Sequence, residues 1–210
     1  VSQFGRTIGT ILKSFPKRLS QNEDQFSEKD SLAFKSYLKL IEHISLTFRV
    51  EEYIHITTQR ILDAISYVIP FVPLQEAEEC INVFKNVYST DNEKMKIAIV
   101  KEMEDSYLTV AHTANFDNDK SERSESSTTD NEMDDDEIQK WGNRRAWIIL
   151  HCKEQILSPY GERFAKKIVS KKENWGQKEN INQIKEILIS IKEKYPDLVG
   201  DADARISELE

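Results

Sequence analysis

Glycine, proline and cysteine are all scarce in this chain of 210 residues, which holds six, five and two of them. Folds rich in β-sheet need many tight turns, and turns use glycine and proline, so the composition argues against such a fold. The two cysteines, Cys80 and Cys152, are too few to build a disulfide framework or to complete a zinc site. Long apolar runs are also missing. No stretch approaches the roughly 20 residues that cross a bilayer, so we expect no membrane partner.

Motifs of catalysis and cofactor binding are missing as well. The sequence has no glycine-rich phosphate loop, no nucleophile elbow and no paired-cysteine metal motif. Its histidines stand apart from one another and from the cysteines in any ligand pattern, and we interpret them as ordinary helix residues: His43, His55, His112 and His151. The sequence therefore predicts that the chain is not an enzyme and binds no cofactor and no metal.

What the chain has in abundance is apolar residues three and four positions apart, on a background of Lys, Glu, Leu and Ile. This spacing places apolar side chains on one face of a helix. We predict helices over about 4–15, 31–48, 51–69, 74–88, 91–112, 138–157, 159–169, 181–195 and 202–209. The fold class is therefore all-α. Short connections favour antiparallel helical hairpins, stacked as an α-solenoid of the HEAT or armadillo kind or packed as an irregular bundle. Such a stack is expected to present broad surfaces and no pocket.

Several residues are expected to mark the ends of these helices. Pro16 is expected to end the first helix because proline lacks the amide donor and clashes with the preceding turn. Caps are expected at Asp30 or Ser31, at Thr90 in a capping box with Glu93, at Ser158 and at Asn180.

An acidic, polar segment divides the helical pattern. Residues 115–137 contain ten Asp or Glu and two basic residues, and most of the others are Ser, Thr and Asn. Such a segment cannot bury enough apolar surface to offset the entropy lost on ordering, which predicts disorder. We therefore divide the chain into helical region 1–113, disordered linker 114–137 and helical region 138–210. Ser127 and Thr129 have acidic residues three positions on, which suits acid-directed kinases; the alternative is a solvated linker without a regulatory role.

Basic residues are concentrated directly after this segment. Positions 138–172 hold only two acidic residues but nine basic ones. The basic residues are Lys140, Arg144, Arg145, Lys153, Arg163, Lys166, Lys167, Lys171 and Lys172. A basic helical patch binds nucleic-acid backbone through counterion release, and Trp141, Trp147 and Trp175 are candidates for stacking on bases. The alternative is a solvated helix face that balances the acidic segment. The chain as a whole has a net charge of −8.

Three short motifs, in this order, resemble one protein family. They are Phe-Gly-Arg-Thr-Ile-Gly at 4–9, Glu-Tyr-Ile-His-Ile at 52–56 and Val-Ile-Pro-Phe-Val-Pro at 68–73. This order resembles the large helical scaffold subunit of the THO complex, which is part of TREX. The resemblance covers about residues 4–110. The family's tryptophan-rich positions between the first two motifs are absent here, and the chain after residue 113 resembles nothing we can place.

The resemblance implies a nuclear scaffold in transcription elongation and in messenger RNA processing, packaging and export. It implies partners among the other THO subunits and a DEAD-box RNA helicase, and it brings no catalytic residue to this chain. Two other functions remain open from the residues alone: a module that binds RNA directly through the basic patch, and a helical-repeat adaptor unrelated to RNA. Since the chain begins at Val1, we expect it to be a piece of a longer polypeptide.

Overall fold

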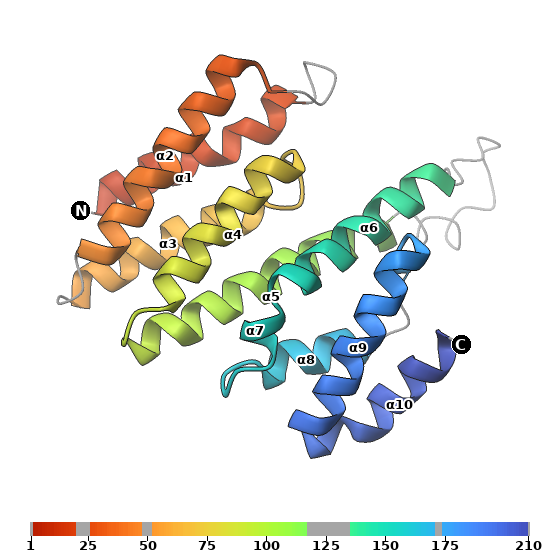
Figure 1. Ribbon diagram of the computed structural model, residues 1–210. Helices are drawn as coiled ribbons and strands as arrows, with labels where there is room; N and C mark the ends of the chain where they lie inside the picture. The colour runs from red at the N-terminus through yellow and green to blue at the C-terminus, as the bar shows by residue number, and fades with distance from the viewer. Residues whose placement is uncertain (1, 20–25, 48–51, 117–134, 171–173, 210) are drawn as a thin grey trace, which may run out of the picture. The chain divides into compact units, whose positions relative to one another are not determined.

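The chain is all-α wherever its structure is described. A computed structural model describes residues 2–19, 26–47, 52–116, 135–170 and 174–209, and none of these residues forms a β-strand (Figure 1). This confirms the fold class expected from the spacing of apolar residues. The structure divides into two compact units, Val1–Ser106 and Tyr107–Glu210.

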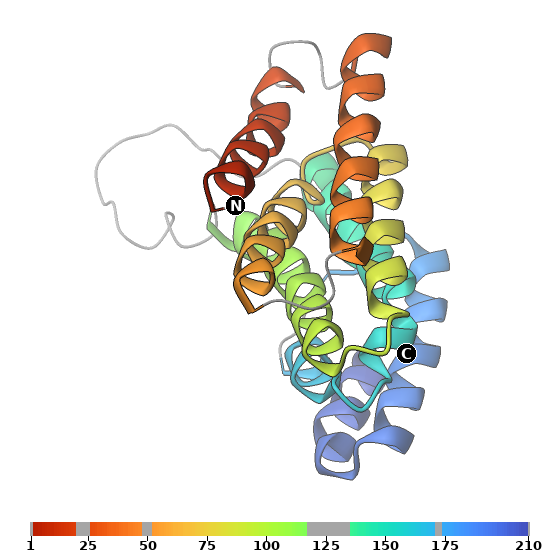
Figure 2. The same cartoon turned by 90° about the vertical axis from the view of Figure 1, so that its left-hand side faces the viewer.

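Unit 1 is built from helices that pack in two layers. Its elements are α1 (Ser2–Leu19), α2 (Glu28–Thr47), α3 (Glu52–Val68), α4 (Leu74–Tyr88) and the first part of α5 (Glu93–Phe116). The most extensive contacts join alternate helices, α1 with α3 and α2 with α4. Figures 1 and 2 accordingly show α1 and α3 on one side and α2 and α4 on the other. Alternate pairing of this kind is how helical hairpins stack in a solenoid.

The predicted apolar stripes form the core of unit 1. Their largest members are fully buried, and they come from all five helices: Leu12, Phe15, Phe34, Ile41, Ile61, Ile65, Ile69, Phe84, Ile99 and Met103. Helix α1 lies against α3 at Gly9, where an added Cβ atom would be 3.5 Å from Cβ of Ala64, an ordinary van der Waals contact. Helix α5 is joined to α3 by the Ser106 hydroxyl, which donates a hydrogen bond of 3.1 Å to the carbonyl oxygen of Ser66.

Unit 2 contains the end of α5 and the following helices: α6 (Asp135–His151), α7 (Lys153–Ile156), α8 (Glu162–Val169), α9 (Lys178–Lys194), a 3-10 helix (Pro196–Leu198) and α10 (Val199–Glu208). Helix α9 packs against both α6 and α10. The buried Tyr195 hydroxyl ties the end of α9 to the turn after α7, since it donates to the carbonyl oxygens of Ile156 and Ser158 at 2.7 and 2.6 Å.

Helix α1 does not end at Pro16, contrary to our expectation, but continues to Leu19. A proline removes the amide that would otherwise bond to the carbonyl four residues earlier. Because Pro16 lies in the last turn of α1, this costs one hydrogen bond near the helix end.

The expected cap of α2 is also wrong. The capping residue is Ser27, whose Oγ accepts the backbone N–H of Asp30 at 3.1 Å and donates to the Asp30 carboxylate at 2.6 Å. An N-cap side chain has to reach the amide about three residues on, and Ser27 is at that distance from Asp30. The capping box expected from Thr90 is absent too. Asn92 Oδ1 accepts the N–H of Met95 at 3.2 Å, whereas the Thr90 hydroxyl donates to the carbonyl of Val87.

Two expected caps in unit 2 have other roles. The Ser158 hydroxyl donates to the carbonyl of Gln155 at 2.7 Å, and α8 begins only at Glu162. Asn180 lies inside α9, and its Nδ2 donates to Oδ1 of Asn143 on α6 at 3.0 Å. The Ser158 side chain thus stabilises a local turn, since its oxygen also accepts the N–H of Tyr160 at 3.2 Å, whereas Asn180 serves tertiary packing, which local sequence patterns do not encode.

Helices enter both ends of the segment that we expected to be a disordered linker. Helix α5 extends to Phe116, and α6 begins at Asp135. Acidic residues suit this start, because the first turn of α6 holds Asp135, Asp136 and Glu137, and negative charge near a helix N-terminus is favourable. Residues 117–134, with Ser127 and Thr129, lie outside the described residues.

Candidate functional site

The nine basic residues predicted to bind nucleic acid do not form one exposed patch. Five of them are exposed, on α6, α7 and α8: Lys140, Lys153, Arg163, Lys166 and Lys167. Arg145 is buried, and Arg144 is half-buried in α6, where desolvation lowers the pKa of its guanidinium to about 10. Lys171 and Lys172 lie outside the described residues. The structure thus leaves a smaller cationic surface than the sequence suggested.

Helix α8 organises the densest part of this surface. Arg163, Lys166 and Lys167 lie three and four positions apart and are all exposed, while Phe164 and Ile168 are fully buried. The helical period therefore separates a cationic face from an apolar one.

The tryptophans differ in their access to solvent. Trp175 is only 4% exposed and has no free face for stacking on a base. Trp147 is half-buried in α6, where its ring stacks on His151 with 4.1 Å between ring centroids, and the Arg144 guanidinium lies 5.8 Å from its centroid. Trp141 is also half-buried.

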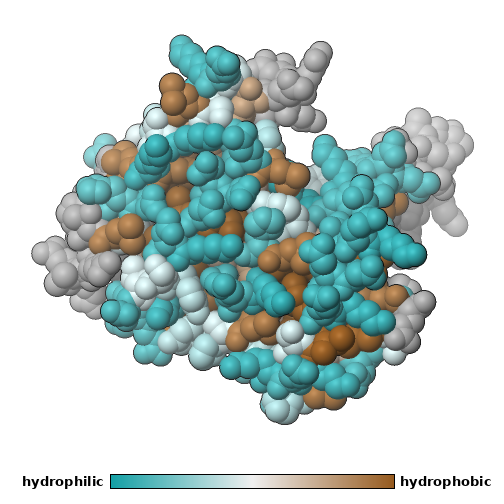
Figure 3. Space-filling view, viewed as in Figure 1, coloured by the Kyte–Doolittle hydropathy of each residue, from teal (hydrophilic) through white to brown (hydrophobic). Residues whose placement is uncertain are grey.

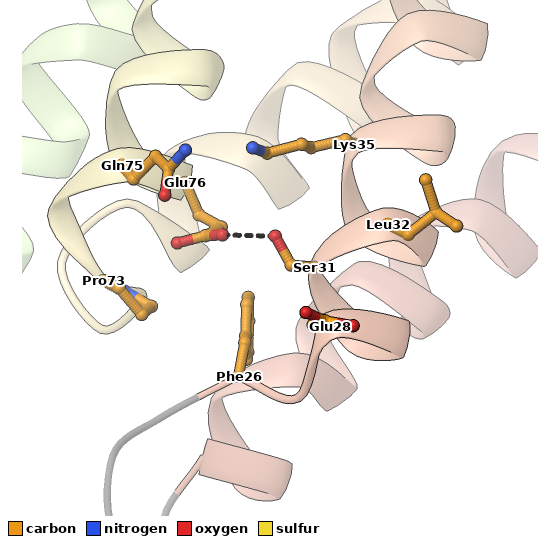
Figure 4. Close-up of a pocket in the computed structure, with 8 residues that line it drawn as sticks. All are labelled: Phe26, Glu28, Ser31, Leu32, Lys35, Pro73, Gln75 and Glu76. Carbon is orange, nitrogen blue, oxygen red and sulfur yellow. Dashed lines mark hydrogen bonds between the residues drawn. The ribbon is translucent and has the colours of Figure 1, made fainter.

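Unit 1 contains an open groove that the sequence did not predict. The groove has a volume of about 520 Å³ and lies where α2 and α4 begin (Figure 4). Its lining combines apolar, acidic, basic and amide side chains: Phe26, Glu28, Ser31, Leu32, Lys35, Pro73, Gln75 and Glu76. The expectation that stacked helices leave no pocket is therefore wrong here. We call this feature the α2/α4 groove.

On the α2 side, the wall of the groove is held by aromatic packing. Phe26 directly precedes the capping residue Ser27, and Figure 4 shows its ring pointing into the groove. The ring of Phe26 packs against Phe15 and Phe34 with centroid distances of 5.6 and 5.7 Å, and Phe15 contacts Phe34 edge-on at 5.1 Å. Aromatic pairs at these distances stabilise each other beyond simple burial. These contacts hold the ring of Phe26 in one position at the edge of the groove.

On the α4 side, prolines set the start of the helix and a hydrogen bond sets its distance from α2. The chain turns after Val68, whose carbonyl accepts the amides of Phe71 and Val72, and Pro73 then directly precedes α4. Glu76 lies in the first turn, where the helix dipole favours a carboxylate. The Ser31 hydroxyl donates to Oε1 of Glu76 at 2.6 Å, so the two helices are joined across the groove (Figure 4).

The groove carries charged groups of both signs. Glu76 is only 4% exposed, whereas Glu28 is exposed and Lys35 is half-buried. Neither Glu28 nor Lys35 forms an ion pair within the described part of the chain. These two charges are therefore available to a ligand.

Large apolar side chains are exposed close to the groove. Leu32 is 69% exposed and lines it, and Leu74, the first residue of α4, is 53% exposed. Figure 3 shows apolar groups between hydrophilic ones over this part of unit 1. An exposed apolar patch with a polar rim is typical of interaction surfaces.

The described residues offer little for redox or metal chemistry. No group of three or more His, Cys, Asp or Glu side chains in the described ranges is placed to hold a metal ion. Cys80 and Cys152 are both buried and are not joined in a disulfide. Burial, with the nearby carboxylates Glu79 and Glu76, raises the pKa of the Cys80 thiol well above its usual value. The thiol is therefore protonated and unreactive at neutral pH.

A buried carboxyl group in α5 is a second feature that the sequence did not reveal. Glu102 is buried and accepts a hydrogen bond of 2.9 Å from the Ser66 hydroxyl. The pKa of Glu102 is raised to about 7, mainly by burial and in part by Asp63 and Asp105, while the Ser66 hydrogen bond and Lys101 oppose the shift. Its contacts belong to the packing between α3 and α5 and line no part of the α2/α4 groove.

Fold and groove together define an all-α protein with an open groove between two helix N-termini. Comparison with protein-family models, with curated proteins and with solved structures finds no match for the chain. Within the described residues, no helix combines the length and apolar character needed to cross a membrane.

One sequence signal could have pointed to the groove. Phe26 is the only large apolar residue in the polar connection between the first two helices, and an aromatic residue there has to pack against something. The other half of the site gives no such signal. Ser31 and Glu76 are 45 residues apart, and nothing local in the sequence pairs them.

Proposed function

We propose that the chain is a scaffold segment of a nuclear complex for transcription-coupled packaging and export of messenger RNA, and that it holds partner proteins rather than catalysing a reaction. The observation that carries this proposal is the exposed apolar surface beside the α2/α4 groove, formed by Leu32 and Leu74. Covering such side chains removes apolar surface from water, which is the main driving force for protein association.

The resemblance to the THO scaffold subunit supports the nuclear part of this proposal. The three motifs that carry the resemblance lie where helices of unit 1 pack, begin or turn. Residues 4–9 include Gly9, where α1 packs on α3, residues 52–56 open α3, and residues 68–73 form the turn that leads into α4. A chain that shares the motifs would therefore share the packing of the first four helices.

Affinity purification of the tagged full-length chain from nuclear extract tests the proposal. We expect subunits of one RNA-packaging complex, including a DEAD-box helicase, to co-purify. Changing Leu32 and Leu74 to Ser should reduce their yield at least about fivefold, as truncation of interface anchors does. The matched control is Ile189→Ser, which removes a similarly exposed apolar side chain from α9 in unit 2. Purification without any RNA-processing protein would contradict the proposal.

A second candidate function is direct binding of RNA through α8. The observation that favours it is the exposed cationic face formed by Arg163, Lys166 and Lys167. Such a face binds phosphates without reading sequence, so its affinity depends on salt.

A further inference from the structure

We propose that the α2/α4 groove binds a short segment of a partner protein in which an apolar side chain lies two positions away from Arg or Lys, so that both point to the same side of an extended chain. This inference rests on the proposed scaffold function and names the chemistry of one partner. The apolar side chain lies against Phe26 and Pro73, and the cation faces Glu28 and Glu76.

The size and form of the groove suit a peptide. Its volume of about 520 Å³ lies within the range of about 300–1,000 Å³ that is usual for ligand sites. The groove is open along one side, and the exposed side chains of Leu32 and Leu74 extend its apolar surface. An extended ligand can therefore bury one side chain in the groove while its backbone continues over the leucines.

The walls of the groove need little ordering on binding. Phe26 is fixed by its contacts with Phe15 and Phe34, and the Ser31–Glu76 hydrogen bond fixes the position of the buried carboxylate. A site that is already ordered loses less conformational entropy when a ligand binds, which favours affinity.

The charges of the groove select a cation. Two carboxylates, Glu28 and Glu76, line it together with one ammonium group, that of Lys35. A basic side chain in the groove therefore has more charges of opposite sign around it than an acidic one would have.

An anion is a poorer match, even though two helix N-termini meet here. Helix N-termini attract anions through their unpaired amides and the helix dipole. In this protein each first turn already holds a carboxylate of the chain itself. Asp30 bonds to the Ser27 cap at the start of α2, and Glu76 occupies the first turn of α4. The chain thus supplies its own anions at both positions.

Selection from a display library of random 12-residue peptides on the intact chain tests the inference. We expect enriched peptides to carry Leu, Ile, Phe or Met two positions away from Arg or Lys. An enriched synthetic peptide should bind the double variant Glu28→Gln, Glu76→Gln at least about tenfold more weakly, because two charge-assisted contacts are lost. Glutamine at position 76 keeps an oxygen that accepts the Ser31 hydrogen bond, so the fold should persist, which circular dichroism checks. The matched control is Glu78→Gln, Glu79→Gln, which should change the affinity less than about twofold.

Enrichment of acidic peptides would overturn the inference, and so would peptides that bind the double variant as well as the wild-type chain. Partner purification with the same double variant separates this inference from the scaffold proposal. If RNA-packaging subunits co-purify but no selected peptide depends on Glu28 and Glu76, the scaffold stands and the groove assignment falls. If groove-dependent peptides are found but no such subunit co-purifies, the groove assignment stands and the nuclear scaffold falls.

Discussion

Glu102 shows how one buried residue makes the stability of the fold depend on pH. Its carboxyl group lies between α3 and α5, where it accepts the Ser66 hydroxyl and has two acidic neighbours, Asp63 and Asp105. Its pKa rises from 4.5 to about 7 on folding, mainly because burial disfavours the charged form. The folded protein therefore holds a proton that the unfolded chain has already lost between these two pH values.

The free energy of unfolding should consequently fall as pH rises from 4.5 to about 7 and then level off. Changing Glu102 to Gln removes the titrating group and keeps an acceptor for the Ser66 hydroxyl. At about pH 8 we expect this variant to be more stable than the wild-type chain by roughly 1–3 kcal/mol, and at about pH 4.5 nearly equal to it. Urea unfolding at both pH values measures the difference. The control is Glu93→Gln, at an exposed position in the same helix, which keeps Glu102. Its difference in stability from the wild-type chain should be the same at both pH values. Equal unfolding curves for Glu102→Gln and wild type at about pH 8 would contradict the argument.

At the scale of helices and turns, glycine decides how closely α6 approaches the segment before α9. A Cβ atom at Gly142 would lie 2.7 Å from the amide nitrogen of Gly176 and 2.8 Å from Oδ1 of Asn174. Gly176 has a φ of 74°, in the left-handed region that other residues rarely adopt. Asn143 completes the contact, because its Oδ1 accepts the N–H of Gln177 at 2.9 Å.

Gly142→Ala should therefore destabilise unit 2 by roughly 1–3 kcal/mol, since backbone atoms have to move to relieve the clash. Gly200 supplies the opposite case in α10, because a Cβ atom there would meet nothing within 4 Å. Gly200→Ala should raise stability by about 0.5–1 kcal/mol through helix propensity alone. Thermal unfolding of the two variants beside wild type measures both effects. A Gly142→Ala protein as stable as wild type would show that the contact is looser than described.

Helices were predictable from the sequence to the extent that local periodicity sets them. The helix predicted over 74–88 matches α4 residue for residue, because Pro73 bounds it and its apolar stripe is regular. Caps were predicted less well. Thr90 was expected to cap α5, but its buried hydroxyl donates to the carbonyl of Val87 at the end of α4, and Asn92 caps α5 instead. The groove was not predictable for a related reason, since its two walls meet through contacts between distant residues.

The whole molecule is acidic, and this bears on the second candidate function. Its net charge of −8 repels nucleic acid at long range, but charges are screened beyond about 8 Å at physiological ionic strength. A local cationic face such as that of α8 can therefore bind phosphates despite the overall charge. Arg145 and Trp175, both buried, cannot contribute.

If α8 binds RNA, its cations should set how strongly the affinity depends on salt. For single-stranded RNA, each neutralised phosphate contributes about 0.7 to the slope of log K against log salt concentration. Changing Arg163, Lys166 and Lys167 to Glu should therefore reduce this slope by roughly 2 and weaken binding. Titrations of a labelled oligonucleotide at several salt concentrations measure both. The control, Lys178→Glu with Lys194→Glu, reverses two exposed charges on α9 outside this face and should leave the slope nearly unchanged. Equal slopes for the α8 variant and the wild-type chain would exclude α8 as an RNA-binding surface and leave only the proposal of protein docking.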